Sequence, residues 1–518
     1  MDAQKKFDTM RLAVISLVAV VAAMVLSIAV LVVRLLSLFE PAACLLSTTG
    51  GEPISIYNIS KIHRGLMLYG NPLIGPHYAS TLYNAGFYYV YAATSWVFSA
   101  NFCDAAIAMR LITLGFAVFG FCSTVRYGFS SFARCAPEAG VDARFVKSAM
   151  VAAAACVWFG TLPGWWILSV RPDVGAVAFC ASAVSLVLLR GAGRELRPVL
   201  LAGVCFAAAW SFKQSAVFLF LAIELSLVLR KRYLQAFVLP IPVVLTVIAF
   251  VIGLGPWYRY NAFVATSFSP FHIQNLSSFL VRIPLKGAFP LAAAVMALPM
   301  LSRIPWLRAD EATTLRTCWW VTLVGSLITC CRGGSEVNYY FEFWTVVGFL
   351  AVIQASFIAR GAFIPRPRVV LFGIAFVGLA ALFSSLVDAG RLIQPDRFGV
   401  VRLEIGPEKT AELERVRDRI RRESRPTFCQ PGLWGLAWGL PFPAYVYDDY
   451  PYFQEPATQR GVLSDGGLAG VFERHHFGLV VLELNSDVFL NQALASGYVR
   501  EPGWSHIVVL TSPATGTD

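Results

Sequence analysis

The feature that most constrains this chain is a series of long apolar stretches that follow one another from residue 12 to residue 387. A helix needs about 20 apolar residues to cross the hydrocarbon core of a bilayer. Charged residues make up only 14% of the sequence, against about a quarter in a soluble domain. The chain is therefore predicted to be a polytopic α-helical membrane protein. The predicted spans are residues 12–38, 104–125, 147–165, 174–189, 198–212, 214–229, 234–255, 287–302, 317–331, 341–359 and 369–387.

A further apolar run, residues 78–100, is interrupted by Asn84 and is rich in tyrosine. Tyrosine prefers the membrane interface, and cytoplasmic loops carry the excess of Lys and Arg. When this run is placed in the outer leaflet, the inner loops hold nineteen Lys and Arg and the outer loops before Asp388 hold eight. Eleven spans are therefore preferred. If the run crosses the bilayer, another crossing is needed elsewhere, and thirteen spans is the alternative.

The two ends of the chain are predicted to lie on opposite sides of the membrane. The first run is longer than the apolar part of a signal peptide and lacks a cleavage site, so we expect it to be retained. An odd number of spans then places residues 388–518 outside, after a membrane domain of residues 1–387 that includes a first outer loop at 39–78. The outer segment has a charged helical stretch, Glu404 to Arg425, and short strand-like runs at 444–447, 479–484 and 506–510 separated by turns. These predict a small C-terminal α/β extracytoplasmic domain.

The net charge of +11 is unevenly distributed between these parts. Residues 1–387 carry 29 Lys and Arg against 14 Asp and Glu, and residues 388–518 carry 13 against 17. The basic excess belongs to the membrane part, where it sets topology and lipid contact. No basic stripe suits a nucleic acid.

The eleven cysteines do not suggest a disulfide framework, because most lie inside apolar runs and are expected to pack as small core residues. Cys44 and Cys429 are the two expected outside the bilayer, so one long-range bridge between them is the most that we consider. The sequence has no Cys-x-x-Cys pair and no His-rich tract, and a zinc site is not indicated.

Glu52 lies in the first outer loop, just ahead of a predicted interfacial helix over residues 54–68 whose apolar side includes Ile54, Leu66 and Met67. A carboxylate there is placed to deprotonate an acceptor hydroxyl that arrives at the membrane surface. The alternative is a structural role, in which Glu52 interacts with the helix dipole or is a solvated loop acid.

Asp173 lies between two apolar runs in the segment Ser169 to Asp173. Because Pro172 suits the start of a helix, Asp173 is expected to cap the following helix or to lie in its first turn. The functional alternative is that Asp173 faces a cavity at the membrane surface and orients a sugar hydroxyl. Glu52 and Asp173 are also the carboxylates available to a divalent cation.

Three cations are predicted on the outer side, each close to aromatic residues: Lys213, Arg259 and Arg332. A single cation of this kind usually extends to lipid headgroups. Together the three are a candidate site for the phosphate of a lipid carrier.

In these motifs the chain resembles the GT-C superfamily of membrane glycosyltransferases, in particular the bacterial branch related to protein O-mannosyltransferases and lipid A aminoarabinose transferases. The first loop resembles the catalytic loop of that family, but it has Gly51-Glu52 where relatives commonly have Asp-Glu. The resemblance implies catalytic roles for Glu52 and Asp173. It also implies substrate contacts by Tyr57, Arg64, Tyr69, Arg171, Asn338, Tyr339 and Glu342.

The resemblance implies an inverting transferase that moves a sugar from a polyprenyl-phosphate carrier to a lipid, glycan or protein acceptor at the outer face of a bacterial inner membrane. The resemblance fixes no cofactor, and it leaves open whether the protein's own cations or a divalent cation stabilise the leaving phosphate. Two other classes compete with this hypothesis. A multi-span transporter or lipid flippase usually has related halves, and none is found here. The second class is a non-catalytic assembly protein, but such a role does not explain why the carboxylates and cations gather on the outer side.

Overall fold

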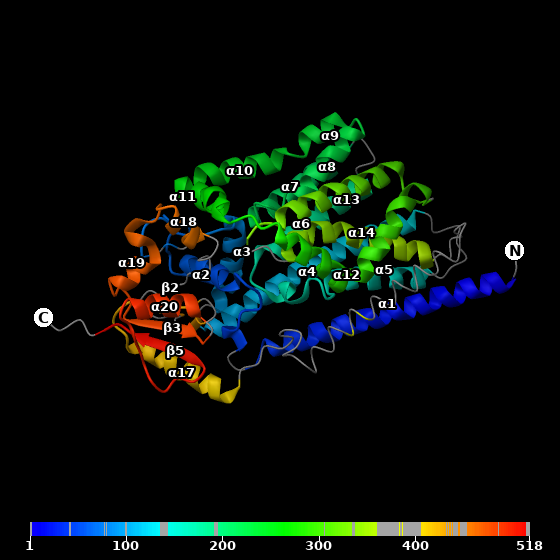
Figure 1. Ribbon diagram of the computed structural model, residues 1–518. Coiled ribbons are helices and arrows are strands. Elements are labelled where there is room, and N and C mark those ends of the chain that lie inside the picture. Colours follow the sequence, from blue (N-terminus) through cyan, green and yellow to red (C-terminus); the bar gives the residue numbers. More distant parts are fainter. Residues whose placement is uncertain are drawn as a thin grey trace.

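The computed structural model describes residues 3–40, 43–76, 78, 80–98, 101–134, 143–190, 195–304, 306–333, 337–359, 383, 386, 406–430, 433, 435–436, 438, 444–445, 453–484 and 486–513. It consists of a bundle of long helices and a smaller part that contains a β-sheet (Figure 1). The N-terminus lies at the end of the molecule away from the sheet, and the C-terminus lies beside the sheet (Figure 1).

The helices of the bundle follow the predicted apolar runs. Their bounds are α1 Ala3–Ser37, α4 Phe102–Ala133, α5 Ala143–Trp158, α6 Pro172–Arg190, α7 Arg197–Phe212, α8 Phe218–Leu229, α9 Tyr233–Val238, α10 Ile241–Gly253, α11 Gly255–Arg259, α12 Gln274–Met300, α13 Ala309–Thr329 and α14 Phe341–Ala359. The run predicted at 234–255 is divided into α9 and α10, and Pro240 and Pro242 lie at this junction. Proline cannot donate a backbone hydrogen bond and therefore interrupts helices.

Four helical stretches in the described residues are long and apolar enough to cross a bilayer. They are Phe102–Ala133, Pro172–Arg190, Tyr233–Gly253 and Val337–Phe357, and five shorter apolar helices accompany them. The run predicted at 369–387 lies outside the described residues except for Phe383 and Leu386. The count of eleven spans therefore stays a prediction.

The described part of the aromatic run at 78–100 forms the short helix α3, Ala85–Ser95, with a 3-10 turn, Trp96–Phe98, after it. Its 11 residues extend about 16 Å at 1.5 Å per residue, whereas the hydrocarbon core is about 30 Å thick. This helix is too short to cross the bilayer by itself, and its assignment to one leaflet stays a prediction.

The helix predicted at 54–68 is α2, Glu52–His63, and it differs from the expectation in two ways. Glu52 is its first residue rather than a residue ahead of it, and the helix ends before Gly65, whose φ of +67° suits a helix terminus. Ile54 is buried, whereas Leu66 and Met67 lie beyond the helix and are 57% and 75% exposed. The helix does not present an apolar side to lipid, because most of its residues pack against protein.

The C-terminal unit, residues 406–513, contains a mixed five-stranded sheet. The strands are β1 Thr427–Cys429, β2 Ala444–Tyr445, β3 Leu479–Glu483, β4 Val499–Arg500 and β5 Ile507–Thr511, in the order β2-β1-β3-β5-β4. Strand β1 pairs in parallel with β2 and β3, and β5 pairs antiparallel with β3 and β4. The helices are α17 Pro407–Arg422, α18 Glu455–Gln459, α19 Gly467–Glu473 and α20 Asp487–Ala495.

Alternate residues of β3 face the two sides of the sheet, as the period of a strand requires. Leu479 and Val481 share a buried cluster with α17, with α2 and with Trp438. Val480 and Leu482 share another cluster with α19. The first outer loop is thereby packed beneath the C-terminal unit, which is why α2 is buried.

Hydrogen bonds also join the C-terminal unit to the first outer loop. The Ser464 amide donates to the Leu73 carbonyl at 2.9 Å, the Gly75 amide donates to Ser464 Oγ at 3.2 Å, and the Tyr78 hydroxyl donates to the Ser464 carbonyl at 2.6 Å. The unit is therefore in direct contact with the segment that contains the candidate residues.

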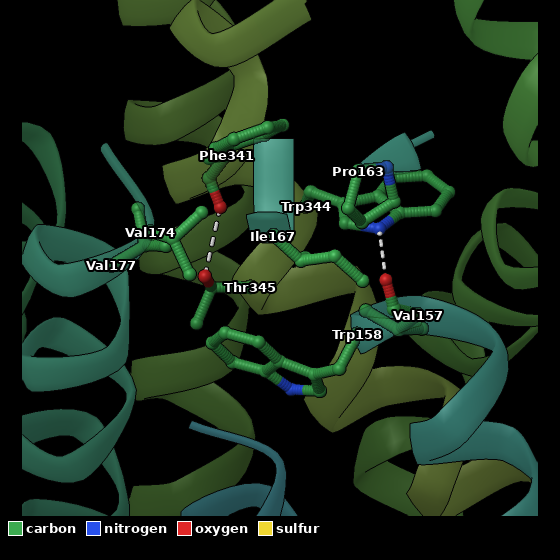
Figure 2. A pocket seen from close by; sticks show the side chains of 9 residues that line it. All are labelled: Val157, Trp158, Pro163, Ile167, Val174, Val177, Phe341, Trp344 and Thr345. Carbon is green, nitrogen blue, oxygen red and sulfur yellow. Dashed lines mark hydrogen bonds between the residues drawn. The ribbon is translucent and has the colours of Figure 1, made fainter. Parts of the chain in front are cut away.

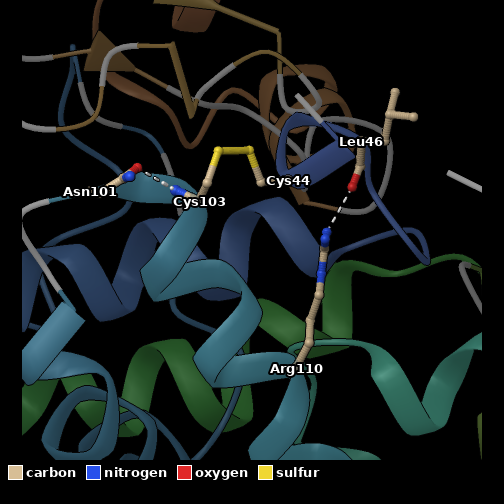
Figure 3. The surroundings of a disulfide bond; sticks show 5 residues. All are labelled: Cys44, Leu46, Asn101, Cys103 and Arg110. Atoms are coloured by element: carbon tan, nitrogen blue, oxygen red, sulfur yellow. Dashed lines mark hydrogen bonds between the residues drawn. A yellow bond between two sulfur atoms is a disulfide. The ribbon is translucent and has the colours of Figure 1, made fainter. Parts of the chain in front are cut away.

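A disulfide joins Cys44 to Cys103, in the first turn of α4 (Figure 3). The sequence did not lead us to expect a disulfide, and the one pairing that it left open, Cys44 with Cys429, is wrong because Cys429 lies in strand β1 and is fully buried as a free thiol. The same helix holds the loop at a second point, where Arg110 Nη2 donates to the Leu46 carbonyl at 2.7 Å (Figure 3). The first outer loop is thus held against α4 by one covalent bond and one charged side chain.

Four arginines predicted to lie inside meet around two adjacent acids at the start of α13. Glu311 pairs with Arg134 and Arg308, each at 2.6 Å. Asp310 pairs with Arg230 at 2.8 Å and Arg232 at 2.6 Å. The three loops that carry these arginines therefore lie at the same end of the bundle, as the alternation of loops requires.

Candidate functional site

Asp173 occupies the first turn of α6, which begins at Pro172, and is only 2% exposed. Its Oδ1 accepts a hydrogen bond from Lys213 Nζ and another from Asn338 Nδ2 at 2.8 Å. Its Oδ2 lies 3.4 Å from Arg171 Nε. Two cations thus face this carboxylate, and their charges compensate its burial.

Lys213 reaches Asp173 because α7 ends at Phe212, so that the lysine leaves the last turn in an extended conformation. Its ammonium also lies 4.7 Å from the centre of the Tyr339 ring, as in a cation–π contact. Asn338 and Tyr339 belong to a short 3-10 turn, Val337–Tyr340, directly before α14. Residues far apart in sequence therefore meet where α6, α7 and α14 have their ends.

These side chains line a cavity of about 20 Å³, enough for one water-sized group. The described residues that line it are Asp173, Ala176, Val177, Lys213, Ser215, Ala216, Phe218, Thr329, Asn338, Tyr339 and Glu342. Asp173 Oδ2 and Asn338 Oδ1 are buried acceptors without a hydrogen-bond partner in the described part of the chain. Buried acceptors of this kind favour a ligand that donates hydrogen bonds.

Glu342 has a structural task in this cavity as well. Its Oε2 accepts a hydrogen bond from the Leu219 amide at 2.7 Å, near the start of α8. A carboxylate at a helix N-terminus satisfies an amide that has no partner within the helix. Glu342 thereby fixes the loop that follows Lys213.

An apolar cavity adjoins the polar one, and Val177 lines both. Figure 2 shows its walls from α5, α6 and α14, including Trp158 and Trp344. Trp344 Nε1 donates to the Val157 carbonyl at 2.9 Å, so the ring has a fixed orientation. The polar groups of the candidate site thus lie against an apolar interior.

Glu52 is fully buried and both of its carboxylate oxygens are occupied. Arg110 donates to Oε1 through Nε and to Oε2 through Nη2, each at 3.0 Å. The Val170 amide donates to Oε1 at 3.0 Å. Thr48 donates to Oε2 through its amide at 2.7 Å and its hydroxyl at 2.8 Å. Burial by itself raises the pKa of the Glu52 carboxyl, but the charge of Arg110 and these hydrogen bonds outweigh it and hold that pKa below its ordinary value.

The surroundings of Glu52 and Asp173 are connected. Val170, whose amide binds Glu52, lies three residues before Asp173 in the chain. Thr49 and Ser169 share a hydrogen bond of 2.6 Å between their hydroxyls. The first outer loop is therefore hydrogen-bonded to the segment that leads into α6.

The other predicted substrate contacts are distributed around this core. Tyr57 is buried in α2, with Lys61 Nζ 5.1 Å from its ring centre. Tyr69 is buried, and its hydroxyl donates to the Tyr83 carbonyl at 2.8 Å. Arg64 follows α2 and is exposed. None of these three lines the polar cavity among the residues described.

Of the three predicted phosphate-binding cations, Lys213 alone lines this cavity in the described chain. Arg259 ends α11 and is exposed. Arg332 forms an isolated antiparallel bridge with Phe271. The structure therefore brings Lys213 together with Asp173, Asn338, Tyr339 and Glu342, and leaves Arg259 and Arg332 outside this group.

Sequence reasoning missed Arg110, which was left out of the loop counts because it lies inside an apolar run. An arginine in a membrane segment needs a partner in the protein, and this requirement could have pointed to an outer carboxylate. No sequence signal pointed to the Val170 amide, because every residue except proline has a backbone amide that can donate.

The described residues contain no group of three His, Cys, Asp or Glu side chains that could hold a metal ion. In the polar cavity the ammonium of Lys213 already contacts Asp173. A divalent cation there would lie close to a positive charge, so the side chains present fit a hydrogen-bonding ligand better than a metal.

No family model and no curated protein sequence matches this chain. Solved structures do. The crystal structure of ArnT from Cupriavidus metallidurans bound to undecaprenyl phosphate superimposes with a TM-score of 0.55 at 11% identity, covering 95% of this chain and 98% of ArnT. The Archaeoglobus fulgidus oligosaccharyltransferase tethered with an acceptor peptide gives 0.52 at 14% identity, covering 96% of this chain and 74% of that one. Both neighbours are GT-C glycosyltransferases.

This chain shares its overall fold with both of these structures. The superposition with ArnT extends over nearly the full length of both chains. The resemblance noted in the sequence motifs is confirmed at the level of fold.

Proposed function

We propose that this chain is an inverting glycosyltransferase that moves a sugar from a polyprenyl-phosphate carrier to a lipid, glycan or protein acceptor at the outer face of the membrane. The observation that carries the proposal is the polar cavity of the GT-C fold, where an acid and a cation from different helices meet. ArnT was crystallised with undecaprenyl phosphate, which supports a carrier of the same class here.

In the proposed reaction the acceptor hydroxyl oxygen forms a bond to the anomeric carbon from one side, and the bond from that carbon to the phosphate oxygen breaks on the other side. The configuration at the anomeric carbon is therefore inverted. The hydroxyl proton passes to a carboxylate, and the carrier phosphate leaves with the additional negative charge. A general base and a cation near the leaving group are the two requirements of this step.

Asp173 is the first candidate for the base. Asp173 lines the cavity, and its Oδ2 has an ion-pair contact with Arg171 but no hydrogen bond, so a hydroxyl can donate to it. Asn338 Oδ1 offers a second acceptor for a sugar hydroxyl in the same cavity. Lys213, now bound to Asp173, is placed to neutralise the leaving phosphate. When the phosphate attracts Lys213, Asp173 loses part of its positive surroundings and accepts a proton more readily.

Glu52 is the second candidate for the base. Its oxygens accept hydrogen bonds from Arg110, Thr48 and Val170, so it has to break one of them before it accepts a proton. The present contacts favour a role in holding the first outer loop beside Asp173. Arg259 and Arg332 lie outside the cavity. They stay candidates for binding the carrier phosphate while the carrier approaches the cavity.

The disulfide supports the outer assignment of this site. Disulfides persist in oxidising compartments such as the periplasm and are rare in the cytosol, and the Cys44–Cys103 bond ties the loop that contains Glu52. We therefore propose that the cavity and the C-terminal unit lie on the outer side of an inner membrane. Labelling of single cysteines tests this: a cysteine near Arg134 that reacts only from outside would overturn the topology.

The function is tested with purified full-length protein, a polyprenyl-phosphate sugar labelled in the sugar, and a panel of lipid, glycan and peptide acceptors. We expect transfer by the parent, loss of turnover in Asp173→Asn, and a smaller loss in Glu52→Gln. If Glu52→Gln abolishes turnover while Asp173→Asn keeps it, the order of the two bases is reversed.

The main alternative is a multi-span transporter or lipid flippase. In sealed vesicles a flippase moves the labelled donor across the bilayer without forming a new glycosidic bond. Donor movement without product for every donor and acceptor tested would reject the transferase.

A further inference from the structure

Arg171 connects three outer segments of the chain. Its guanidinium donates to the Gly50 carbonyl through Nη1 and to the Tyr83 hydroxyl through Nη2 at 2.7 Å. Its Nε lies 3.4 Å from Asp173 Oδ2. The guanidinium also lies 4.5 Å from the centre of the Trp166 ring. A planar group with several donors is suited to hold such partners at the same time.

Gly51 provides the space in which this guanidinium lies. Its φ of +73° turns the backbone just before α2. A Cβ built at Gly51 would lie 2.9 Å from Arg171 Nη1 and 3.4 Å from Arg171 Cζ. Both contacts are with the far end of a flexible side chain, so a methyl group would displace the guanidinium rather than the backbone.

We infer that Arg171 is a positioning residue that holds Asp173 in register with the first outer loop, and that Gly51 is required because its missing side chain leaves room for the guanidinium. The inference deepens the proposed function and rests on it for its catalytic part. It differs from the expectation that Arg171 contacts the substrate. It also gives a physical reason why an acid is absent beside Glu52: the space that a side chain at position 51 needs is already filled.

The first experiment needs no substrate. Full-length protein in detergent is treated with p-hydroxyphenylglyoxal, which modifies arginine, and the rate at Arg171 is measured by peptide mass spectrometry against the exposed Arg259 in the same sample. Gly51→Ala should raise the relative rate at Arg171 on the order of tenfold, as expected when about 1.4 kcal/mol of restraint is lost. The control is Gly503→Ala, because Gly503 has a φ of +86° and a Cβ added there would meet nothing within 4 Å.

A second variant protects the test against misfolding of Gly51→Ala. Tyr83→Phe removes one acceptor of the guanidinium without changing the loop backbone, and it should also raise the rate at Arg171 several-fold. Unchanged Arg171 rates in both folded variants would overturn the inference. If Gly51→Ala does not fold, the result for Tyr83→Phe decides alone.

The catalytic part is tested by a double-mutant cycle in the transfer assay. Arg171→Met should lower kcat on the order of 10- to 150-fold, since charge-assisted hydrogen bonds contribute about 1.5 to 3 kcal/mol each. Gly51→Ala should lower kcat about tenfold alone and have no further effect in the Arg171→Met background, because coupled residues are not additive. The KM for the donor should change less than twofold.

Three results of the cycle contradict a positioning role. A raised donor KM at unchanged kcat would make Arg171 a substrate contact. Multiplicative effects of the two substitutions would show that Gly51 acts independently of Arg171. Full activity of Arg171→Met would remove its role. If the parent shows no transfer at all, the proposed function fails, and the labelling experiment still decides whether Gly51 holds the place for Arg171.

Discussion

Replacing Arg110 by methionine should expose how strongly the first outer loop depends on one buried ion pair. The side chains of Arg110 and Glu52 are each 1% exposed. Removing the cation leaves the Glu52 charge buried with only the hydrogen bonds from Thr48 and Val170. Breaking a buried pair in this way costs about 3–5 kcal/mol. Arg110→Met also loses the hydrogen bond to the Leu46 carbonyl.

The cost converts to a shift in melting temperature. The unfolding entropy is about 2.1 cal/mol/K per residue, and the chain has 518 residues. A loss of 1 kcal/mol in the free energy of unfolding therefore lowers the Tm by roughly 1 °C. The Tm of Arg110→Met should therefore fall by roughly 3–5 °C. The measurement is scanning fluorimetry of the full chain in detergent, which uses its 13 tryptophans. Arg259→Met is the matched control, because Arg259 is exposed.

The pH dependence gives an independent readout with a definite sign. In the parent the pKa of Glu52 is lowered, so its contribution to stability is present above the unfolded pKa of about 4.3 and is lost as the pH falls through the folded pKa. Without Arg110, burial dominates and raises that pKa. The Tm deficit of Arg110→Met should then shrink as the pH is lowered from about 8 to about 5.

A double variant separates charge from packing. Arg110→Met combined with Glu52→Gln removes both charges and should recover more than half of the lost Tm, since no buried charge is left unpaired. The reasoning is refuted if Arg110→Met is as stable as the parent, or if its deficit is the same at every pH and in the double variant.

Three further predictions concern other parts of the molecule. Peptide mapping without reductant should recover Cys44 linked to Cys103, and a different partner for Cys44 would contradict the packing of the first outer loop. Burial by itself raises the pKa of Glu412, but hydrogen bonds from the turn before β5 hold that pKa below its ordinary value. The stability that Glu412 contributes is therefore present above about pH 4.3 and should be lost at lower pH in the parent. Circular dichroism between pH 3 and pH 7 should show this loss in the parent and not in Glu412→Gln. In donor titrations Lys213→Met should weaken donor binding roughly 10- to 150-fold and Arg259→Met much less, whereas equal losses would move the phosphate site out of the cavity.

The sequence by itself determined the elements whose signals are local. Apolar runs of helical length predicted the bundle, because burial in a membrane depends on the composition of each segment. Pro172 predicted the start of α6 and hence the place of Asp173, because proline suits the first turn of a helix. The charged stretch ending at Arg425 predicted α17, which ends at Arg422. In each case the residues that decide the structure are neighbours in the chain.

The tertiary structure alone decided how these elements meet. Arg110 and Glu52 are 58 residues apart, and Lys213 and Asp173 are 40 apart; neither pairing follows a helical or strand period. The spacing of cysteines does not reveal which thiol approaches Cys44, because a disulfide depends on the positions of two chain segments in space. The burial of α2 follows from packing under the C-terminal unit. Local patterns carry no information about such contacts, since the same apolar face can pack against lipid or against protein.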